Sequence, residues 1–311
     1  VYILTRDFIP TAFAATRKMT EPKSEAYSKF LGISEKEYKE TSKRIGELLN
    51  GHGGKTVKSI RDELGTKLNI SPIVNLMCDQ GLLIRGAPEK GWKSNLHTYH
   101  LFNEYFPDIR LDQESEEDAR KKVVAAHLSS FGPATETDIS WWTGFSKGEV
   151  RQIINDLKDK VVYIGNSTSD KTYLVLSEQI GLLMGLKETK KDIVNLLPGL
   201  DPYLMGYKER HRYLDQKNYD YIFDPAGNAT STILLNGETI GVWDVYEKPR
   251  PLVKLFLFEG VQNEVLKDIH SMAKKIGKFI MEKEVQIKEC DSMTPLTRRK
   301  AGGVMSPLKD N

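Results

Sequence analysis

The densest group of chemically useful side chains lies in the segment GYKERHRY, residues 206–213. Its cations, its titratable ring and its two tyrosines are Tyr207, Lys208, Arg210, His211, Arg212 and Tyr213. Lysine and arginine donate to phosphate oxygens, so this composition predicts contacts with a nucleic-acid backbone. The alternative is a solvated, charged helix end, because such charges are common on protein surfaces.

Two further polar groups suit the same chemistry. Asp201 stands just before Pro202, where a carboxylate could orient a base, a water molecule or an arginine, or could cap the helix that Pro202 opens. The loop APEKGWKSNL carries Lys90, Trp92 and Lys93, which suit phosphate or minor-groove contacts. The alternative for this loop is a solvated hairpin tip with Trp92 folded onto its own domain.

The segment GFSKG, residues 144–148, matches the G-x-S-x-G pattern of a hydrolase nucleophile elbow. That motif needs a buried strand before Ser146, whereas a short helix with Trp141 and Trp142 is predicted there. Ser146 with Glu149 fits a capping box instead, in which both side chains accept from backbone N–H groups. We therefore predict a helix cap, and we expect the two tryptophans to anchor a core.

The elements predicted around Ser146 follow the order of a winged helix. Apolar spacing indicates helices over residues 119–131, 136–142 and 147–157. Gly132-Pro133 ends the first of them, and the strands VVYIG and KTYLVL form a hairpin. The third helix of a winged helix usually lies in the major groove, with the hairpin as its wing. Residues 34–106 repeat this order, which makes the loop with Trp92 the wing of a first module.

The polar, acidic stretch PDIRLDQESEED is the clearest predicted domain boundary. The predicted segments are an N-terminal remnant (1–33), winged helix 1 (34–106), the acidic linker (107–118), winged helix 2 (119–176), a connecting segment (177–195), a winged-helix-like domain (196–285) and a flexible tail (286–311). The connecting segment contains IGLLMGL, which we expect to join one domain to the next.

The last domain is predicted to contain an antiparallel β-meander and a long amphipathic helix. A three-stranded meander is expected over residues 218–246, with Asn236-Gly237 as a hairpin turn and residues 252–259 as a fourth strand. Residues 262–282 have apolar side chains at helical spacing. The predicted fold class is therefore α+β and mainly helical, with tandem winged helices and a C-terminal α/β winged-helix-like domain.

Composition narrows the functional class. The net charge is +2 and the pI is near 8.3, so any nucleic-acid surface must be a local patch. No apolar run reaches the ~18 residues of a membrane span. The separated cysteines Cys78 and Cys290 match no metal spacing and favour a reducing cytoplasm. His97 and His100 would lie on opposite faces of a strand, so no metal site is predicted.

Three segments together resemble a known family: GPATETDISWWTG, LLPGLDPYLMGYKER and ILLNGETIGVW. They resemble the triple winged-helix DNA glycosylases, which remove alkylated bases and unhook interstrand crosslinks. The resemblance spans about residues 1–283, with the motifs in the family's order. It implies a C-shaped molecule that binds double-stranded DNA in a basic channel and cleaves the N-glycosidic bond of a damaged purine.

The family's catalytic motif is Gln-x-Gln or Gln-x-Asp, in the N-terminal part of its sequence. VYILTRDFIP resembles a segment after that motif, and the opening of this chain contains neither form. The expectation is a glycosylase seen without its catalytic segment, so no catalytic residue is assigned. We further expect a cytoplasmic monomer, nucleoid-associated in a prokaryote, that needs no cofactor. The alternatives are a non-catalytic DNA-binding protein or transcription regulator, and a protein-interaction platform.

Overall fold

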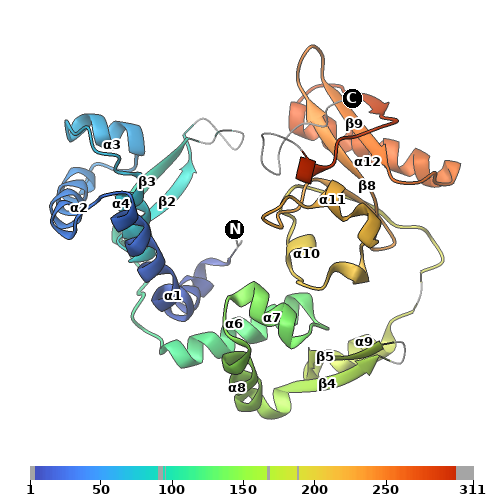
Figure 1. Cartoon of the computed structure of the whole chain (residues 1–311), viewed down its shortest axis with the longest axis horizontal. Coiled ribbons are helices and arrows are strands. Elements are labelled where there is room, and N and C mark those ends of the chain that lie inside the picture. The colour runs from blue at the N-terminus through green and yellow to red at the C-terminus, as the bar shows by residue number, and fades with distance from the viewer. Residues whose placement is uncertain (1–3, 90–93, 95, 167–168, 188, 299–311) are drawn as a thin grey trace. The chain divides into compact units, whose positions relative to one another are not determined.

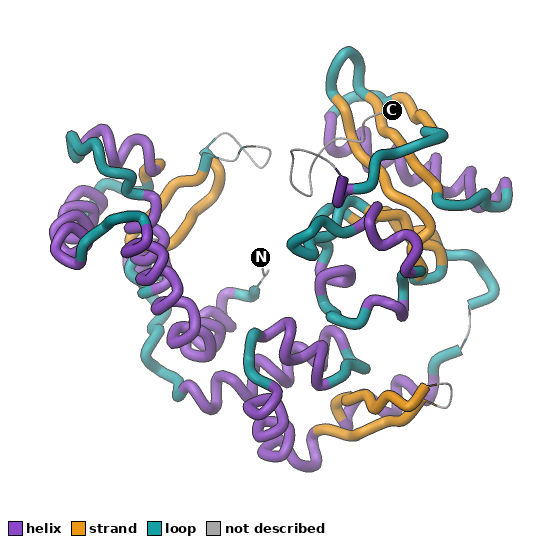
Figure 2. Tube along the Cα trace, in the orientation of Figure 1, coloured by secondary structure: helices purple, strands orange, loops and turns teal. Residues whose placement is uncertain are grey.

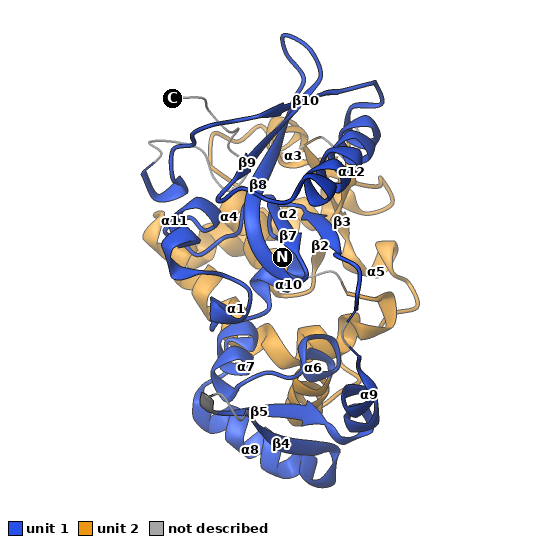
Figure 3. Ribbon diagram, turned by 90° about the vertical axis from the view of Figure 1, so that its right-hand side faces the viewer, with its two compact units in different colours: residues 1–2, 126–311 blue, residues 3–125 orange. Residues whose placement is uncertain are grey.

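The computed structural model describes residues 4–89, 94, 96–166, 169–187 and 189–298. They form two compact units, one within Ile3–Ala125 and the other within Ala126–Asn311 (Figure 3). Both units contain helices and β-sheet, so the predicted α+β class is confirmed (Figures 1 and 2). The division falls inside one helix, α6 (Glu116–Phe131), and not in the acidic stretch 107–118.

The described part of the unit within Ile3–Ala125 contains a long first helix, four further helices, a small sheet and the start of α6. Its elements are α1 (Ile9–Phe30), α2 (Glu35–Leu49), β1 (Lys55–Thr56), α3 (Val57–Glu63), α4 (Ser71–Asp79), β2 (Leu83–Pro88), β3 (His97–Leu101) and α5 (Phe102–Tyr105). The strands form an antiparallel sheet in the order β1-β3-β2. The core of this unit includes Ile45, Ile60 and Ile73, which are fully buried.

Local signals set the helix ends of this unit. The predicted capping box at the start of α2 is present, because the Ser34 hydroxyl accepts from the Glu37 N–H and the Glu37 carboxylate accepts from the Ser34 N–H. The acidic stretch 107–118 is anchored within the same unit. Glu114 accepts from the Thr11 hydroxyl at 2.6 Å and forms an ion pair with Lys122. These partners hold the predicted linker against α1 and α6.

The first part of the second unit follows the predicted order of helices and hairpin. After α6 come α7 (Glu136–Thr143), α8 (Lys147–Leu157), β4 (Val161–Asn166), β5 (Ser169–Leu176) and α9 (Ile180–Gly185). Strands β4 and β5 pair antiparallel, and α6 ends just before Gly132-Pro133 as predicted. The expected packing of α9 between domains is not seen at Leu182 and Met184, which are 68% and 83% exposed.

The rest of this unit is built on a five-stranded sheet. Its strands are β6 (Val194–Leu197), β7 (Thr232–Leu235), β8 (Glu238–Tyr246), β9 (Leu252–Leu257) and β10 (Gln286–Glu289). The order is β10-β9-β8-β7-β6, antiparallel except for the parallel pair β9–β10. Asn236 and Gly237 have φ angles of 53° and 88°, which is the backbone that the predicted two-residue hairpin requires.

Two sequence predictions about this sheet were wrong. Residues 219–222 form a helical turn, α11 (Tyr219–Ile222), and not the first strand of the meander. The Tyr219 and Phe223 rings stack at 5.1 Å, a contact that the i, i+4 spacing of a helix allows, whereas residues four apart on a strand are separated by ~13 Å. β6 takes the place of the expected strand beside β7. β10 lies where a flexible tail was predicted and pairs with β9.

The two faces of the sheet carry different layers (Figure 1). α12 (Asn263–Met281) packs on one face, where Val265 and Ile269 meet Val253 of β9. The opposite face holds α10 (Pro202–Met205), α11 and the buried tyrosines Tyr207 and Tyr213. The GYKERHRY segment therefore packs, through its two tyrosines, on the face of the sheet opposite α12.

Candidate nucleic-acid interface

The GYKERHRY segment alternates between buried anchors and exposed polar side chains. Tyr207 and Tyr213 are buried in the core, and the Tyr213 hydroxyl donates to the Leu204 carbonyl at 2.9 Å. Lys208 and His211 are exposed. Arg210 and Arg212 are half-buried, on a short 3₁₀ turn, Arg210–Arg212. The candidate interface thus has two side chains directed to solvent on an anchored backbone.

Asp138, at the start of α7, is the central partner of this segment. It is fully buried, and its carboxylate receives five hydrogen bonds. Oδ1 accepts from the Lys208 N–H at 2.8 Å and the Glu209 N–H at 3.0 Å. Oδ2 accepts from the Thr135 N–H and hydroxyl, at 3.0 and 2.9 Å, and from Arg212 Nη2 at 3.4 Å. One carboxylate therefore joins the cap of α7 to the backbone of the candidate interface.

The guanidinium group of Arg212 is held by partners within the chain at both of its terminal nitrogens and over one face. Besides its ion pair with Asp138, it donates through Nη1 to the Pro133 carbonyl at 2.9 Å. The group also lies over the Tyr207 ring, with Cζ 3.9 Å from the ring centroid. Such a cation–π contact adds to the hydrogen bonds that fix the side chain.

Arg210 is held in the same way by a different set of groups. Its guanidinium donates to the Tyr219 hydroxyl at 2.7 Å and to the Gly227 carbonyl at 2.9 Å. Cζ lies 3.5 Å above the Phe223 ring and 5.7 Å from Trp141. The sequence assigned both arginines to phosphate contacts, but the structure directs both guanidinium groups toward internal partners.

His127 of α6 lies against Gly206, the first residue of the segment. The ring is buried between Phe131 and Trp142, with centroid distances of 5.2 and 4.9 Å. Nε2 lies 3.3 Å from the Gly206 carbonyl, and Nδ1 has no hydrogen-bond partner within the described part of the chain. Burial lowers the pKa of His127 to about 4, so the ring is neutral at pH 7.

The remaining candidates divide between helix caps and residues outside the described ranges. Asp201 is half-buried and accepts from the Tyr203 N–H at 2.9 Å, as a cap for α10; burial raises its pKa. Ser146 accepts from the Glu149 N–H, and Glu149 accepts from the Ser146 N–H, so the predicted capping box is confirmed. The predicted wing residues lie outside the described residues: Lys90, Trp92 and Lys93.

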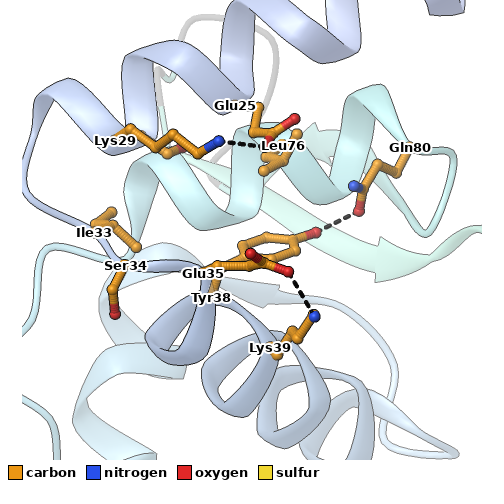
Figure 4. A pocket seen from close by; sticks show the side chains of 10 residues that line it. Glu25, Lys29, Ile33, Ser34, Glu35, Tyr38, Lys39, Leu76 and Gln80 are labelled. Atoms are coloured by element: carbon orange, nitrogen blue, oxygen red, sulfur yellow. Dashed lines mark hydrogen bonds and ion pairs between the residues drawn. The ribbon is translucent and has the colours of Figure 1, made fainter.

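A separate pocket of about 210 Å³ lies between α1, α2 and α4 (Figure 4). The Tyr38 hydroxyl donates to the Gln80 side chain at its centre, and burial raises the pKa of Tyr38 to about 12. Ion pairs Lys29–Glu25 and Lys39–Glu35 flank this contact, with N–O distances of 2.7 and 2.6 Å. Because these polar groups are already paired within the chain, the pocket offers little to bind a ligand.

The described ranges contain neither a metal-binding cluster nor a membrane-spanning helix. No group of three or more His, Cys, Asp or Glu residues there could hold a metal ion. None of the helices placed by the structure is both long and apolar enough to cross a membrane.

Comparison with known proteins identifies the family. The family model for AlkZ-like DNA glycosylases matches residues 1–275, and the chain therefore belongs to the AlkZ-like DNA glycosylase family. Among solved structures, the chain is similar to the Streptomyces sahachiroi DNA glycosylase AlkZ. The TM-score is 0.69 with 18% sequence identity, over 91% of this chain and 76% of that one. At this identity the likeness shows the fold alone. No match is found among curated proteins.

Proposed function

We propose that the protein binds double-stranded DNA and acts in the repair of alkylated or crosslinked purines by hydrolysis of the N-glycosidic bond. The observation that carries this proposal is the family match over residues 1–275. An alkylated purine already bears positive charge and leaves readily. The reaction then needs a positioned water molecule and stabilisation of an oxocarbenium-like sugar, which an amide or a carboxylate can supply. It requires no metal or cofactor.

The chain contains no Gln-x-Gln or Gln-x-Asp sequence. We therefore propose that residues of this chain hold DNA, and we assign no catalytic side chain. Lys208 and His211 are the proposed phosphate contacts, because they are exposed on an anchored backbone. Arg210 and Arg212 are proposed to position that backbone through their internal contacts, and Asp201 to cap α10.

We also propose that α2 to β3 and α6 to β5 are winged-helix modules. Their third helices differ in what they can offer to DNA. α4 carries no lysine or arginine, and its side chains Ile73, Val74 and Met77 are buried in the core of its unit. We therefore infer that the first module contacts DNA through its wing, with Lys90, Trp92 and Lys93, and not through α4. By contrast, α8 exposes Lys147 and Arg151.

The test is duplex binding measured over a series of salt concentrations, followed by an excision assay. Binding should weaken steeply as salt rises, since each neutralised phosphate releases counterions. The excision substrate is a duplex carrying N7-alkylguanine or an interstrand crosslink, and the readout is release of the base. The double variant Lys208→Ala/His211→Ala should lose affinity equally for all duplex sequences. Lys36→Ala, which removes an exposed cation from α2, is the control.

The outcomes separate the candidate functions. Release of the alkylated base supports the glycosylase. Tight, salt-dependent binding with no base release from any of these substrates would contradict it and favour a non-catalytic DNA-binding protein. Absence of duplex binding at low salt would exclude both, and leave the protein-interaction alternative, for which the exposed Leu182 and Met184 on α9 offer an apolar surface.

A further inference from the structure

The exposed side chains of the candidate interface owe their placement to a residue far from them in sequence. Asp138 lies on α7, whereas three of its five donors come from the segment 208–212, which is 70 to 74 residues further along the chain. A cap for α7 needs only the contacts with Thr135. The hydrogen bonds from Lys208, Glu209 and Arg212 are therefore not needed for the cap, and they tie residues 208–212 to Asp138.

The geometry at Oδ1 constrains the backbone that carries Lys208. Two consecutive N–H groups, those of Lys208 and Glu209, converge on this one oxygen at 2.8 and 3.0 Å. Convergent amides of this kind fix the peptide between them, and hydrogen bonds to an ionised acceptor are the stronger ones. The Lys208 side chain remains exposed while its own N–H is buried in this contact. Its direction is thus tied to the position of the Asp138 carboxylate.

The segment is also fastened beside this contact. Arg212 joins Asp138 to the Pro133 carbonyl, and Glu209 forms an ion pair with Lys171 of β5. The Tyr207 hydroxyl donates to the Phe131 carbonyl at 3.0 Å. A Cβ atom on Gly206 would approach the Phe131 ring to 2.6 Å, so the backbone lies directly against α6. These anchors all connect residues 206–212 to the helix–hairpin module of α6 to β5.

We propose that Asp138 is a positioning residue for DNA binding, which holds the backbone of Lys208 and the guanidinium of Arg212 so that Lys208 and His211 face a phosphate of the duplex. This inference rests on the proposed function, because it names the group that orders the proposed contact. Asp138 itself touches no DNA: it is fully buried. Its effect must therefore pass through Lys208 and His211.

The test is Asp138→Asn, measured by duplex affinity and by the dependence of affinity on salt. The asparagine side chain can still accept at its one oxygen. Its NH₂ group, however, would face the donor groups of Thr135 and Arg212, and the negative charge that pairs with Arg212 would be lost. We expect about tenfold weaker binding, the loss of roughly one charge-assisted contact, with a salt slope lowered by about one. Adding Lys208→Ala to this variant should cost little more, because both changes remove the same contact.

Two further variants keep the test decisive. Ser34→Ala removes a comparable capping box on α2, a helix that carries none of the proposed DNA contacts, so it should keep the wild-type affinity and slope. If Asp138→Asn does not fold, Arg212→Lys retains a cation beside Asp138 but loses the paired donors, and should lower the slope in the same way. Circular dichroism establishes whether each variant is folded.

The results distinguish this inference from the proposed function. If the wild-type chain does not bind duplex DNA, the proposed function fails and this inference fails with it. If the wild type binds and Lys208→Ala weakens binding, but folded Asp138→Asn matches the wild type, then only the positioning role is overturned. Losses for Asp138→Asn and Lys208→Ala that add fully would also overturn it, since independent residues do not share one contact.

Discussion

Asp138 and His127 are both buried beside the candidate interface, and each meets the cost of burial differently. Asp138 is compensated by five donors and by the charge of Arg212. His127 has one hydrogen-bond contact and lies between the aromatic rings of Phe131 and Trp142. Burial therefore favours its neutral form and lowers its pKa to about 4.

A first prediction concerns how His127 makes the stability of the fold depend on acidic pH. The unfolded ring has its ordinary pKa of 6.5, while the folded ring stays neutral down to about pH 4. The unfolded state thus binds the extra proton, and the free energy of unfolding should fall as the pH drops from 6.5 to 4. The full effect is on the order of 3 kcal/mol, and it is absent above pH 7. Urea unfolding followed by tryptophan fluorescence at several pH values measures it.

The matched variant is His127→Gln, which removes the titrating ring and keeps a polar side chain. It should be less stable than the wild type at pH 7.5, yet lose less stability on acidification. Equal pH dependence in the two proteins would show that other groups, and not His127, cause the acid sensitivity.

A second prediction concerns Ser146, the residue of the G-x-S-x-G pattern. Its hydroxyl accepts from the Glu149 N–H in an exposed capping box. Ser146→Ala should lower the free energy of unfolding by about 1 kcal/mol, the usual cost of a lost cap. Any base release by the wild type should persist, as an excision assay would show. Loss of base release with unchanged stability would instead support a nucleophile.

At the scale of elements, the contact between α12 and the sheet depends on a small residue. A Cβ atom on Gly277 would lie 2.5 Å from Val253 and 2.7 Å from Val285, two apolar side chains that line the same core. α12 could then stay helical only by moving away from β9. We predict that Gly277→Ala destabilises the protein by about 1 to 3 kcal/mol, as overpacked cores generally do. Thermal unfolding measures the change.

For a glycine in α2, we predict that substitution by alanine has the opposite effect and raises the stability. Gly46 lies inside this helix, and a Cβ atom there would meet nothing within 4 Å. Gly46→Ala should stabilise the protein by about 1 kcal/mol, because alanine loses less backbone entropy in a helix. A lower unfolding temperature for this variant would contradict the prediction. It would mean that helix propensity and core contacts do not decide the stability of α2 at this position.

At the scale of the whole molecule, each unit has its own hydrophobic core. Ile45, Ile60 and Ile73 belong to the unit within Ile3–Ala125, whereas Ile233 and Ile269 belong to the other. A domain with its own core can unfold separately. We predict two calorimetric transitions. Gly46→Ala should move only one of them and Gly277→Ala only the other. A single transition displaced by both variants would mean that the units unfold together.

Much of the local structure could be predicted from the sequence. The capping boxes at Ser34 and Ser146, the helix end at Gly132-Pro133 and the Asn236-Gly237 turn are all confirmed. Each depends on side chains and backbone groups only a few residues apart, so spacing alone carries the information. The composition of GYKERHRY also drew attention to a segment that the structure anchors through Asp138, Phe131 and Pro133.

What the sequence misjudged depended on distant partners. Tyr219–Ile222 has the aromatic composition of a strand, but Tyr219 stacks on Phe223 and bonds Arg210 instead. The α9 segment is apolar, yet Leu182 and Met184 are exposed in the part of the chain that the structure describes. Aromatic and apolar residues suit several structures, and the contacts that choose between them come from elsewhere in the chain.

The sequence by itself determined the helix caps, the turns, the family and the existence of a cationic segment, because these reside in short patterns. Only the tertiary structure decided which of those cations face solvent. Arg210 and Arg212 turn inward to carbonyls, aromatic rings and Asp138, while Lys208 and His211 remain exposed. The physical reason is that a buried carboxylate is stable only when it is hydrogen-bonded, and the donors of Asp138 come from distant parts of the chain. No spacing pattern in the sequence indicates those contacts.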